Sequence, residues 1–366
     1  MKKIITLFLV SIVAFSISKS TINAQERMSM SELDPYMSSY MEPFAKAMAV
    51  SMSGGWAHTA KVHSTLGFDL TFSISATQVP DAVMSFNPNS IGMSDIYSFN
   101  SSTTPTISGS DELTAASISR EFSTPLAPDL EVPGFPGVNL SYGGMFAIQG
   151  AIGLPKGFEL IVRFVPDIST MTNNMIPGDD FGLQETGMWG IGIKHDIKQW
   201  IPVVKSVPFL QISGLFTYSK FHTGFSGDAF RIAPEDFEAE TDLPSTTWDN
   251  QNFAMEMSSL TGSLLVGANI PIFQPYIGLG FNSASFDGGL RGNYPIVDLN
   301  VDLTDPSGFV FEVTESETDP INIEANATNF NFQAGARLKL GPIVFHYTMT
   351  LQDYMMHSGG IAVTIR

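Results

Sequence analysis

Apolar and polar residues alternate strictly from Leu66 to Thr77, where every even position is apolar and every odd position is small or polar. A period of two residues predicts a β-strand with one apolar face and one polar face. At about 3.3 Å per residue this strand would be about 40 Å long, enough to cross a bilayer at a tilt. The stretch therefore predicts a membrane-spanning strand.

The same alternation returns along the rest of the chain. It recurs at 140–152, 158–164, 189–195, 210–218, 260–270, 275–281, 330–340, 343–351 and 361–365. Short connections are expected at 153–157, 198–207, 271–273 and 341–342, and long ones at 80–137, 169–185, 223–252 and 287–326. Short turns at one end and long loops at the other are typical of outer-membrane barrels. We predict an all-β fold, a transmembrane antiparallel β-barrel of at least ten strands over residues 65–366, with both chain ends at the short-turn side.

The number of strands has alternatives. Segments 297–303 and 309–313 also alternate, and Asp305-Pro306-Ser307-Gly308 between them suits a tight turn. The polar face of this pair carries several acids, so we interpret it as an extracellular hairpin. If the pair inserted into the membrane, the barrel would have twelve strands, and another pair within 80–122 would make fourteen.

The first 24 residues predict a secretory signal peptide. Lys2 and Lys3 precede the apolar stretch Ile4 to Ile17, and a short polar stretch ends at Ala24. The chain contains no cysteine, which excludes a lipoprotein anchor and disulfides. Export together with a barrel pattern predicts the outer membrane of a Gram-negative cell.

Residues 25–64 are expected to form an N-terminal helical plug or linker. Apolar side chains recur at helical spacing, including Tyr36, Tyr40, Phe44 and Met48. Pro35 and Pro43 suit first turns of helices, so two short helices are expected rather than one. The stripe could fill the barrel lumen, lie on its periplasmic face or act only as a linker.

The stretch Gly54 to Leu70, with Pro43-Phe44 before it and Val79-Pro80 after it, resembles an uncharacterised family of Bacteroidetes outer-membrane proteins. The family is a domain of unknown function, so the resemblance implies a membrane β-barrel and carries over no functional residues. A more distant likeness of architecture is to long-chain fatty-acid channels, which place a helical hatch before the barrel. Their Asn-Pro-Ala hatch motif is not matched, since Asn87-Pro88-Asn89 echoes it only in part, and this puts a fatty-acid cargo in doubt.

Acidic residues concentrate in the expected long loops. The formal charge is −18, and loss of Lys2, Lys3 and Lys19 with the signal peptide makes it −21. Loops 80–137, 223–252 and 287–326 carry net charges of −6, −6 and −8. This distribution argues against nucleic-acid partners. It favours solvation of the outer face or, alternatively, cation-bridged contact with lipopolysaccharide or a filter for cationic solutes.

No signature of catalysis is present, so we expect neither an enzyme nor a bound cofactor or metal. The chain lacks H-E-x-x-H, G-x-S-x-G and Walker motifs. His58 and His63 flank Lys61 at a spacing with no known metal-ligand geometry, so we interpret them as polar plug residues. His346 could take part in a Ser-His dyad like that of outer-membrane phospholipases, but no acid or amide at a suggestive spacing orients it.

The polar faces of the strands predict which side chains line the lumen. These lumen-facing candidates are Asp69, Gln149, Glu159, Arg163, Gln211, Gln333, Arg337, Lys339 and His346. Mixed charges of this kind either form a salt-bridge network that fills a narrow barrel or line a polar conduit.

The combination predicts a passive channel or transporter for small solutes. The alternative is a non-transporting structural or surface-interaction barrel that acts through its acidic extracellular loops. The expected partners are outer-membrane lipid and lipopolysaccharide, with divalent cations bridging at the acidic loops.

Overall fold

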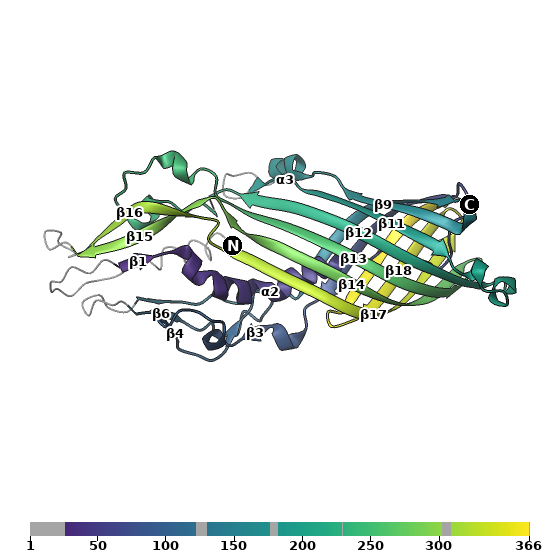
Figure 1. The fold of residues 1–366 in the computed structure, drawn as a ribbon, viewed down its shortest axis with the longest axis horizontal. Helices are drawn as coiled ribbons and strands as arrows, with labels where there is room; N and C mark the ends of the chain where they lie inside the picture. The colour runs from purple at the N-terminus through teal and green to yellow at the C-terminus, as the bar shows by residue number, and fades with distance from the viewer. Residues whose placement is uncertain (1–25, 122–129, 176–181, 229, 302–308, 366) are drawn as a thin grey trace.

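Ten strands close into one antiparallel barrel in the computed structural model, which describes residues 26–121, 130–175, 182–228, 230–301 and 309–365 (Figure 1). The barrel strands are β2 (Phe68–Gln78), β8 (Tyr142–Leu154), β9 (Phe158–Val165), β11 (Gly187–Asp196), β12 (Leu210–Ser226), β13 (Asn252–Ala268), β14 (Phe273–Arg291), β17 (Asn322–Leu340), β18 (Ile343–Leu351) and β19 (Met356–Ile365). Because β19 pairs with β2, the ring of strands has no open edge. The predicted fold class is confirmed. The expected signal peptide and the turn at 305–308 lie outside the described residues.

The outward face of the barrel is apolar near the short turns. On β2, Leu70, Phe72 and Ile74 are each about half exposed, at 56%, 48% and 54%, while the neighbouring Thr71 and Ser73 point inward and are buried. A continuous apolar outer surface of this kind is stable against lipid tails and not against water. The alternation in the sequence therefore matches a lipid-facing wall.

Four strands extend much further than their alternation predicted. β12, β13, β14 and β17 continue beyond the expected limits at 218, 260, 281 and 330, and in Figure 1 they reach further to the left than the other barrel strands. Along these extensions the polarity is reversed, because Phe221, Met257 and Phe286 point inward and are buried. On these extensions the outward face meets water and the inward face meets α2. A search for strands whose apolar side chains face outward therefore ends before the true end of each strand.

We predict that the reversal marks the outer boundary of the lipid. Ile277 lies midway along the lipid-facing part of β14, and Ser285 faces the same side of this strand beyond the boundary. Ile277→Arg is expected to destabilise the barrel by about 2–4 kcal/mol, the cost of arginine near the bilayer midplane, and Ser285→Arg to have little effect. Urea unfolding in lipid vesicles measures both, and equal losses would place the boundary elsewhere.

The connections at the two ends differ in length, with one exception. Turns 155–157, 197–209, 269–272 and 341–342 lie at the end where β19 finishes, shown with the C-terminus in Figure 1. Long connections lie at the opposite end, but the link between β18 and β19 there has only four residues, 352–355. Both strands end near the membrane boundary, so a tight turn is enough to join them.

The long connections carry small sheets of their own. β15 (Asn293–Val301) and β16 (Phe309–Thr318) form a hairpin outside the barrel that pairs with β1 (Glu26–Met28). This placement agrees with the expected extracellular hairpin, so the described strands give neither twelve nor fourteen barrel strands. Connection 79–141 contains β3 (Ser85–Phe86), β4 (Tyr97–Phe99), β5 (Thr104–Pro105), β6 (Ile118–Arg120) and β7 (Leu130–Val132), and connection 166–186 contains α3 (Ser169–Met175) and β10 (Gly182–Leu183).

The N-terminal segment runs in the opposite direction to the one expected. β1 lies at the long-loop end, whereas β2 starts at the short-turn end. Between them Ser51 Oγ donates to Gly143 O (2.8 Å) near one end of β8, and Leu66 N donates to Gly153 O (2.9 Å) near the other. The expectation of both chain ends on the short-turn side is therefore wrong, because residues 52–64, here called the lumen segment, descend through the barrel.

One helix, α2 (Asp34–Ser51), precedes the lumen segment in place of the two expected. It continues through Pro43, although proline removes one helical hydrogen bond and crowds the preceding turn. The helix contacts β8, β14 and β17, and this packing offsets the cost at Pro43. No helix in the described part of the chain is long and apolar enough to cross a membrane.

Candidate functional site

The lumen segment is buried and tied to the barrel wall by polar contacts. The guanidinium of Arg163 stacks on the Trp56 ring at 4.0 Å and donates through Nη1 to Met52 O (3.2 Å). Arg163 Nη2 also donates to Gln149 Oε1 (3.0 Å) on the neighbouring strand. Arg163 is 1% exposed, so its charge is stabilised by these fixed partners rather than by bulk water.

Two histidines of the lumen segment meet two carboxylates of the wall. His58 Nε2 lies 3.0 Å from Asp69 Oδ2, and His63 Nδ1 lies 2.9 Å from Glu159 Oε2. Lys194 Nζ is 3.6 Å from Glu159 Oε1 and donates to Lys61 O (2.7 Å). Each of these acids therefore joins the segment to the wall, and removal of either would leave buried groups without their partner.

The wall also provides space for the segment. A Cβ atom on Gly143 would lie 2.4 Å from the carbonyl carbon of Ala47, and one on Gly190 would lie 2.9 Å from Cη2 of Trp56. Glycine is thus required where the helix backbone and the indole approach the strands. Tyr276 completes the fit by donating its hydroxyl to Ala57 O (2.8 Å).

The structure places every lumen-facing candidate on the inner side of the wall. Asp69, Gln149, Glu159, Arg163, Arg337 and His346 are buried, and Gln211, Gln333 and Lys339 are half-buried. Gln149 joins Arg163, and Asp69 and Glu159 join the histidines. Gln333 instead donates to Ser263 Oγ (2.9 Å), away from this cluster.

Sequence reasoning missed several members of this cluster. Lys194 and Tyr276 lie at inward positions of β11 and β14, which strand alternation could have found. Trp56 and the pairing of His58 with Asp69 had no such signal, because the lumen segment has no periodic pattern.

The four plug candidates lie at the mouth of the barrel rather than along its lumen. Tyr36 packs on Phe86, Phe99 and Phe135 of connection 79–141, with its ring 6.0 Å from that of Phe99. Tyr40 donates its hydroxyl to Pro136 O (2.8 Å) in the same connection. Burial raises the pKa of the Tyr36 phenol.

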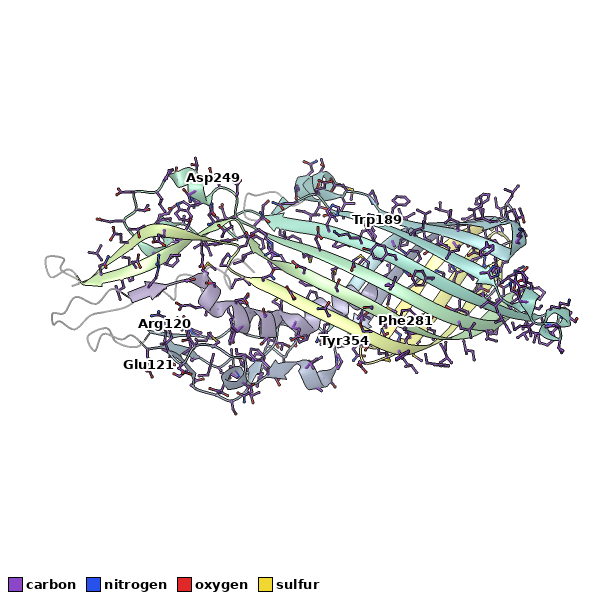
Figure 2. The ribbon with its side chains drawn as sticks, viewed as in Figure 1. Arg120, Glu121, Trp189, Asp249, Phe281 and Tyr354 are labelled. Atoms are coloured by element: carbon purple, nitrogen blue, oxygen red, sulfur yellow. The ribbon has the colours of Figure 1, made fainter. Side chains whose placement is uncertain are left out.

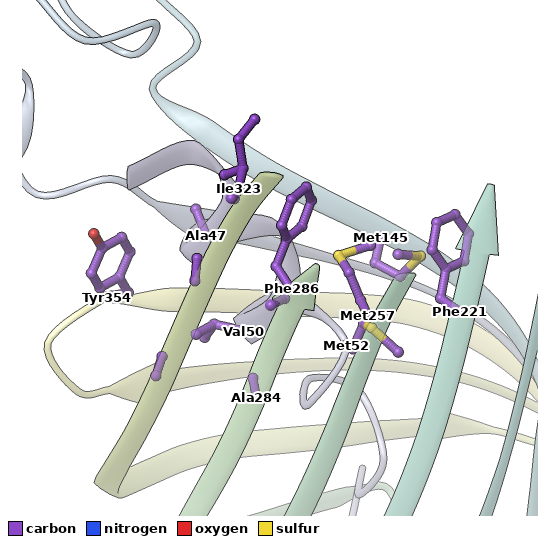
Figure 3. Packing of buried hydrophobic residues seen from close by; sticks show 14 of the residues in the cluster. Ala47, Val50, Met52, Met145, Phe221, Met257, Ala284, Phe286, Ile323 and Tyr354 are labelled. Atoms are coloured by element: carbon purple, nitrogen blue, oxygen red, sulfur yellow. The ribbon is translucent and has the colours of Figure 1, made fainter. Parts of the chain in front are cut away.

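The other face of α2 closes the mouth. Phe44 and Met48 are half-buried, while Ala47 and Val50 are fully buried in the cluster that contains Phe221, Met257 and Phe286 (Figure 3). Tyr36 and Tyr40 of the predicted stripe therefore bind a loop. Met48 instead packs against the strands, as Ala47 and Val50 do.

Little free space remains beside the lumen segment. One cavity of about 20 Å³ lies between Trp56, Thr261 and Gln333, and a second of about 20 Å³ lies near Lys61. A cavity of this size holds about one water molecule. At these two places the lumen segment leaves room for little more than water.

Two of the long connections pack on each other beyond the lipid-facing wall. We call the described residues of 79–141, 166–186, 227–251 and 292–321 the crown. Phe237 and Trp248 of one connection pack on Tyr294, Val297 and Val313 of the hairpin. Glu240 N donates to Phe311 O (2.9 Å), and Val313 N donates to Glu240 O (2.8 Å). The crown is thus a packed structure with its own apolar core.

Acidic side chains remain on the outside of the crown. Glu238, Asp242 and Asp249 are exposed, and Figure 2 shows Asp249 and Glu121 at the crown end, far from Trp189 and Phe281 on the barrel wall. Arg120 is engaged with Glu32, its Nε lying 3.3 Å from Oε2. The crown therefore presents carboxylates that are available to external cations.

Two structural observations bear on the histidines and acids discussed from the sequence. They contain no group of three or more His, Asp or Glu side chains placed to hold a metal ion. Both ring nitrogens of His346 lack a hydrogen-bond partner within the described part, so no Ser-His dyad is formed there. The ring centroids of His346 and His58 are 5.2 Å apart.

Comparison with known proteins identifies a family without an assigned activity. The model of the Family of unknown function (DUF6588) matches residues 1–365. None of the curated proteins compared with the chain matches it.

Solved structures that resemble the chain are membrane proteins of distant sequence. The translocator domain of the autotransporter NalP from Neisseria meningitidis has 9% identity and a TM-score of 0.31, covering 92% of this chain and 100% of that one. The attachment invasion locus protein Ail of Yersinia pestis has 10% identity and a TM-score of 0.21, covering 82% and 100%. A BenF-like porin from Pseudomonas fluorescens has 9% identity and a TM-score of 0.13, covering 82% and 98%. Likenesses this distant carry no argument about function.

Proposed function

Since the chain belongs to this family of unknown function, its role has to come from its own geometry, and we propose that it is a closed outer-membrane barrel that presents the acidic crown as an interaction surface. The observation that carries the proposal is the packing of connection 227–251 on the β15–β16 hairpin and of connection 79–141 on α2. Loops that only solvate a barrel do not need apolar cores of their own. A folded crown supports recognition of a partner.

The filled lumen supports the same proposal. A passive channel needs a continuous polar path, and here the lumen segment occupies the barrel between Ser51 and Leu66. Buried charge-assisted contacts at His58, His63 and Arg163 hold it there. Such contacts suit a permanent structural element.

The partner we propose is lipopolysaccharide bridged by divalent cations. The crown and the phosphorylated sugars of lipopolysaccharide are both anionic, so they repel each other in the absence of a counter-ion. Carboxylate oxygens are ligands that Ca²⁺ and Mg²⁺ prefer. A cation shared between an exposed crown carboxylate and a phosphate would turn the repulsion into attraction.

We predict that binding of purified protein to lipopolysaccharide depends on Mg²⁺ and on the crown acids. The triple variant Glu238→Gln, Asp242→Asn, Asp249→Asn is expected to weaken Mg²⁺-dependent co-sedimentation with lipopolysaccharide at least fivefold, and EDTA to abolish it for the unaltered chain. All three residues are exposed and make no described ion pair, so the fold is expected to persist.

The matched control replaces neighbouring neutral residues, Ser245→Ala and Thr246→Ala, which are equally exposed. It is expected to bind as the unaltered chain does. Co-sedimentation that is unchanged by EDTA, or unchanged in the triple variant, would contradict the cation bridge.

A second candidate function is passage of small solutes when the lumen segment moves. The observation that favours it is a group of buried hydroxyls on β12 and β13 that have no hydrogen-bond partner in the described part of the chain: Ser213, Thr217, Ser219, Ser259 and Thr261. A wall of this kind is suited to water. The segment would then be a movable plug.

A reversible lock separates the two candidates. Ser51 Oγ donates to Thr77 Oγ1 at 2.9 Å, so cysteines at both positions are close enough for a disulfide. Under the first candidate, planar-bilayer recordings of S51C/T77C show no conductance steps in either the oxidised or the reduced state. Steps that appear only after reduction would favour the channel.

A further inference from the structure

A basic cavity lies at the short-turn end of the lumen. Its lining includes Lys61, His63, Gln274, Arg337, Lys339 and Thr364. Arg337 and Lys339 are two residues apart on β17 and therefore face the same side, directly before the turn at 341–342. Lys61 approaches them from the lumen segment.

The cations of this cavity have no anionic partner of their own. Arg337 is 4% exposed, and its Nε has no hydrogen-bond partner in the described residues. The carboxylates that act on Arg337, those of Asp69 and Glu159, are already engaged by His58, His63 and Lys194. Lys61 and Lys339 form no ion pair with any described acid. The buried charge of Arg337 is costly unless something else neutralises it, whereas Lys61 and Lys339 are half-buried.

The size of the cavity restricts what can neutralise them. A volume of about 20 Å³ accepts one group of about the size of a water molecule. A chloride ion or a single carboxylate group is compatible with this volume. The uncharged donor Thr364 adds a hydroxyl to the lining.

We propose that this cavity binds a compact singly charged anion, either chloride or the carboxylate of a small solute, from the short-turn side of the barrel. The ligand would sit between Lys61, Arg337 and Lys339 and join the lumen segment to β17. Binding would stabilise the folded barrel, because a ligand of the native state raises its stability in proportion to the logarithm of its concentration. This inference does not depend on the function proposed for the crown.

The test is thermal unfolding of the full chain in detergent, in HEPES buffer at constant ionic strength. Chloride or acetate is expected to raise the unfolding midpoint with saturation. A response to chloride alone identifies an inorganic ligand, and a tighter response to acetate identifies a carboxylate.

Two variants and one control attribute the effect to the cavity. K61Q/K339Q is expected to weaken the apparent affinity for the anion at least tenfold. K339Q alone is expected to weaken it at least threefold, and this single variant keeps the test possible if the double variant folds poorly. K205Q removes an exposed lysine from the connection between β11 and β12 and is expected to change nothing. No rise with chloride or acetate, a rise that does not saturate, or an unchanged affinity in K339Q would overturn the proposal.

Discussion

Replacing Glu159 by glutamine is expected to destabilise the protein by about 3–5 kcal/mol, the typical cost of removing one partner from a buried charged pair. Glu159 is 3% exposed, and its carboxylate meets Lys194 Nζ at 3.6 Å and His63 Nδ1 at 2.9 Å. The amide of glutamine preserves the volume but not the charge, so Lys194 would stay buried without its counter-charge. Urea unfolding followed by tryptophan fluorescence measures the change.

The control for this variant uses the same substitution at an exposed ion pair. Glu256 Oε2 lies 2.8 Å from Lys220 Nζ on the outer surface of the crown-side extensions. Glu256→Gln is expected to leave the unfolding midpoint unchanged, because solvent and salt screen such pairs. Equal midpoints for both variants would mean that the contacts in the lumen do not hold the segment.

Labelling of single cysteines on intact cells is expected to change from complete to absent over a short stretch of the chain. Ser31 precedes α2 on the crown side, and Ser64 is the last residue of the lumen segment, at the short-turn end; both are exposed. A membrane-impermeant maleimide should therefore label S31C on intact cells and S64C only after the outer membrane is permeabilised. Because the natural chain has no cysteine, the background is zero.

Two other positions calibrate this experiment. Ser245 lies in the crown and Lys205 in a short-turn connection, so S245C should label on intact cells and K205C should not. If S31C behaved like K205C while S245C labelled, the N-terminal segment would not pass through the lumen.

The barrel could be predicted from the sequence because lipid imposes one rule on every strand. Leu70, Ile148 and Phe332 stand in the apolar register, and one residue of slip would turn each of them into the lumen. The rule applies only to the part of each strand that faces lipid. Beyond it, Phe221, Met257 and Phe286 are apolar side chains that point inward, so the alternation did not predict the extensions of β12, β13 and β14.

The wall residues of the candidate site could be predicted from the sequence, but their partners in the lumen segment could not. Alternation identified Asp69 and Glu159 as inward-facing, but their partners come from a segment without periodicity. His63 and Glu159 are 96 positions apart, and only closure of the barrel brings them together. The direction of the lumen segment was equally hidden, because a helix before the first strand is compatible with either side of the membrane.

The pairing of β1 with the outer hairpin has a mechanical consequence. β15 follows β14 in the chain, and β16 precedes β17. A force that pulls on the hairpin would load the ladder between β14 and β17 in shear, so that many hydrogen bonds resist it together. β1 adds a second route, since it is hydrogen-bonded to β15 and continues through α2 into the lumen segment. A force applied to the hairpin would thus reach the lumen segment inside the barrel. The connection that must withstand this force is the pairing of the three residues of β1 with β15.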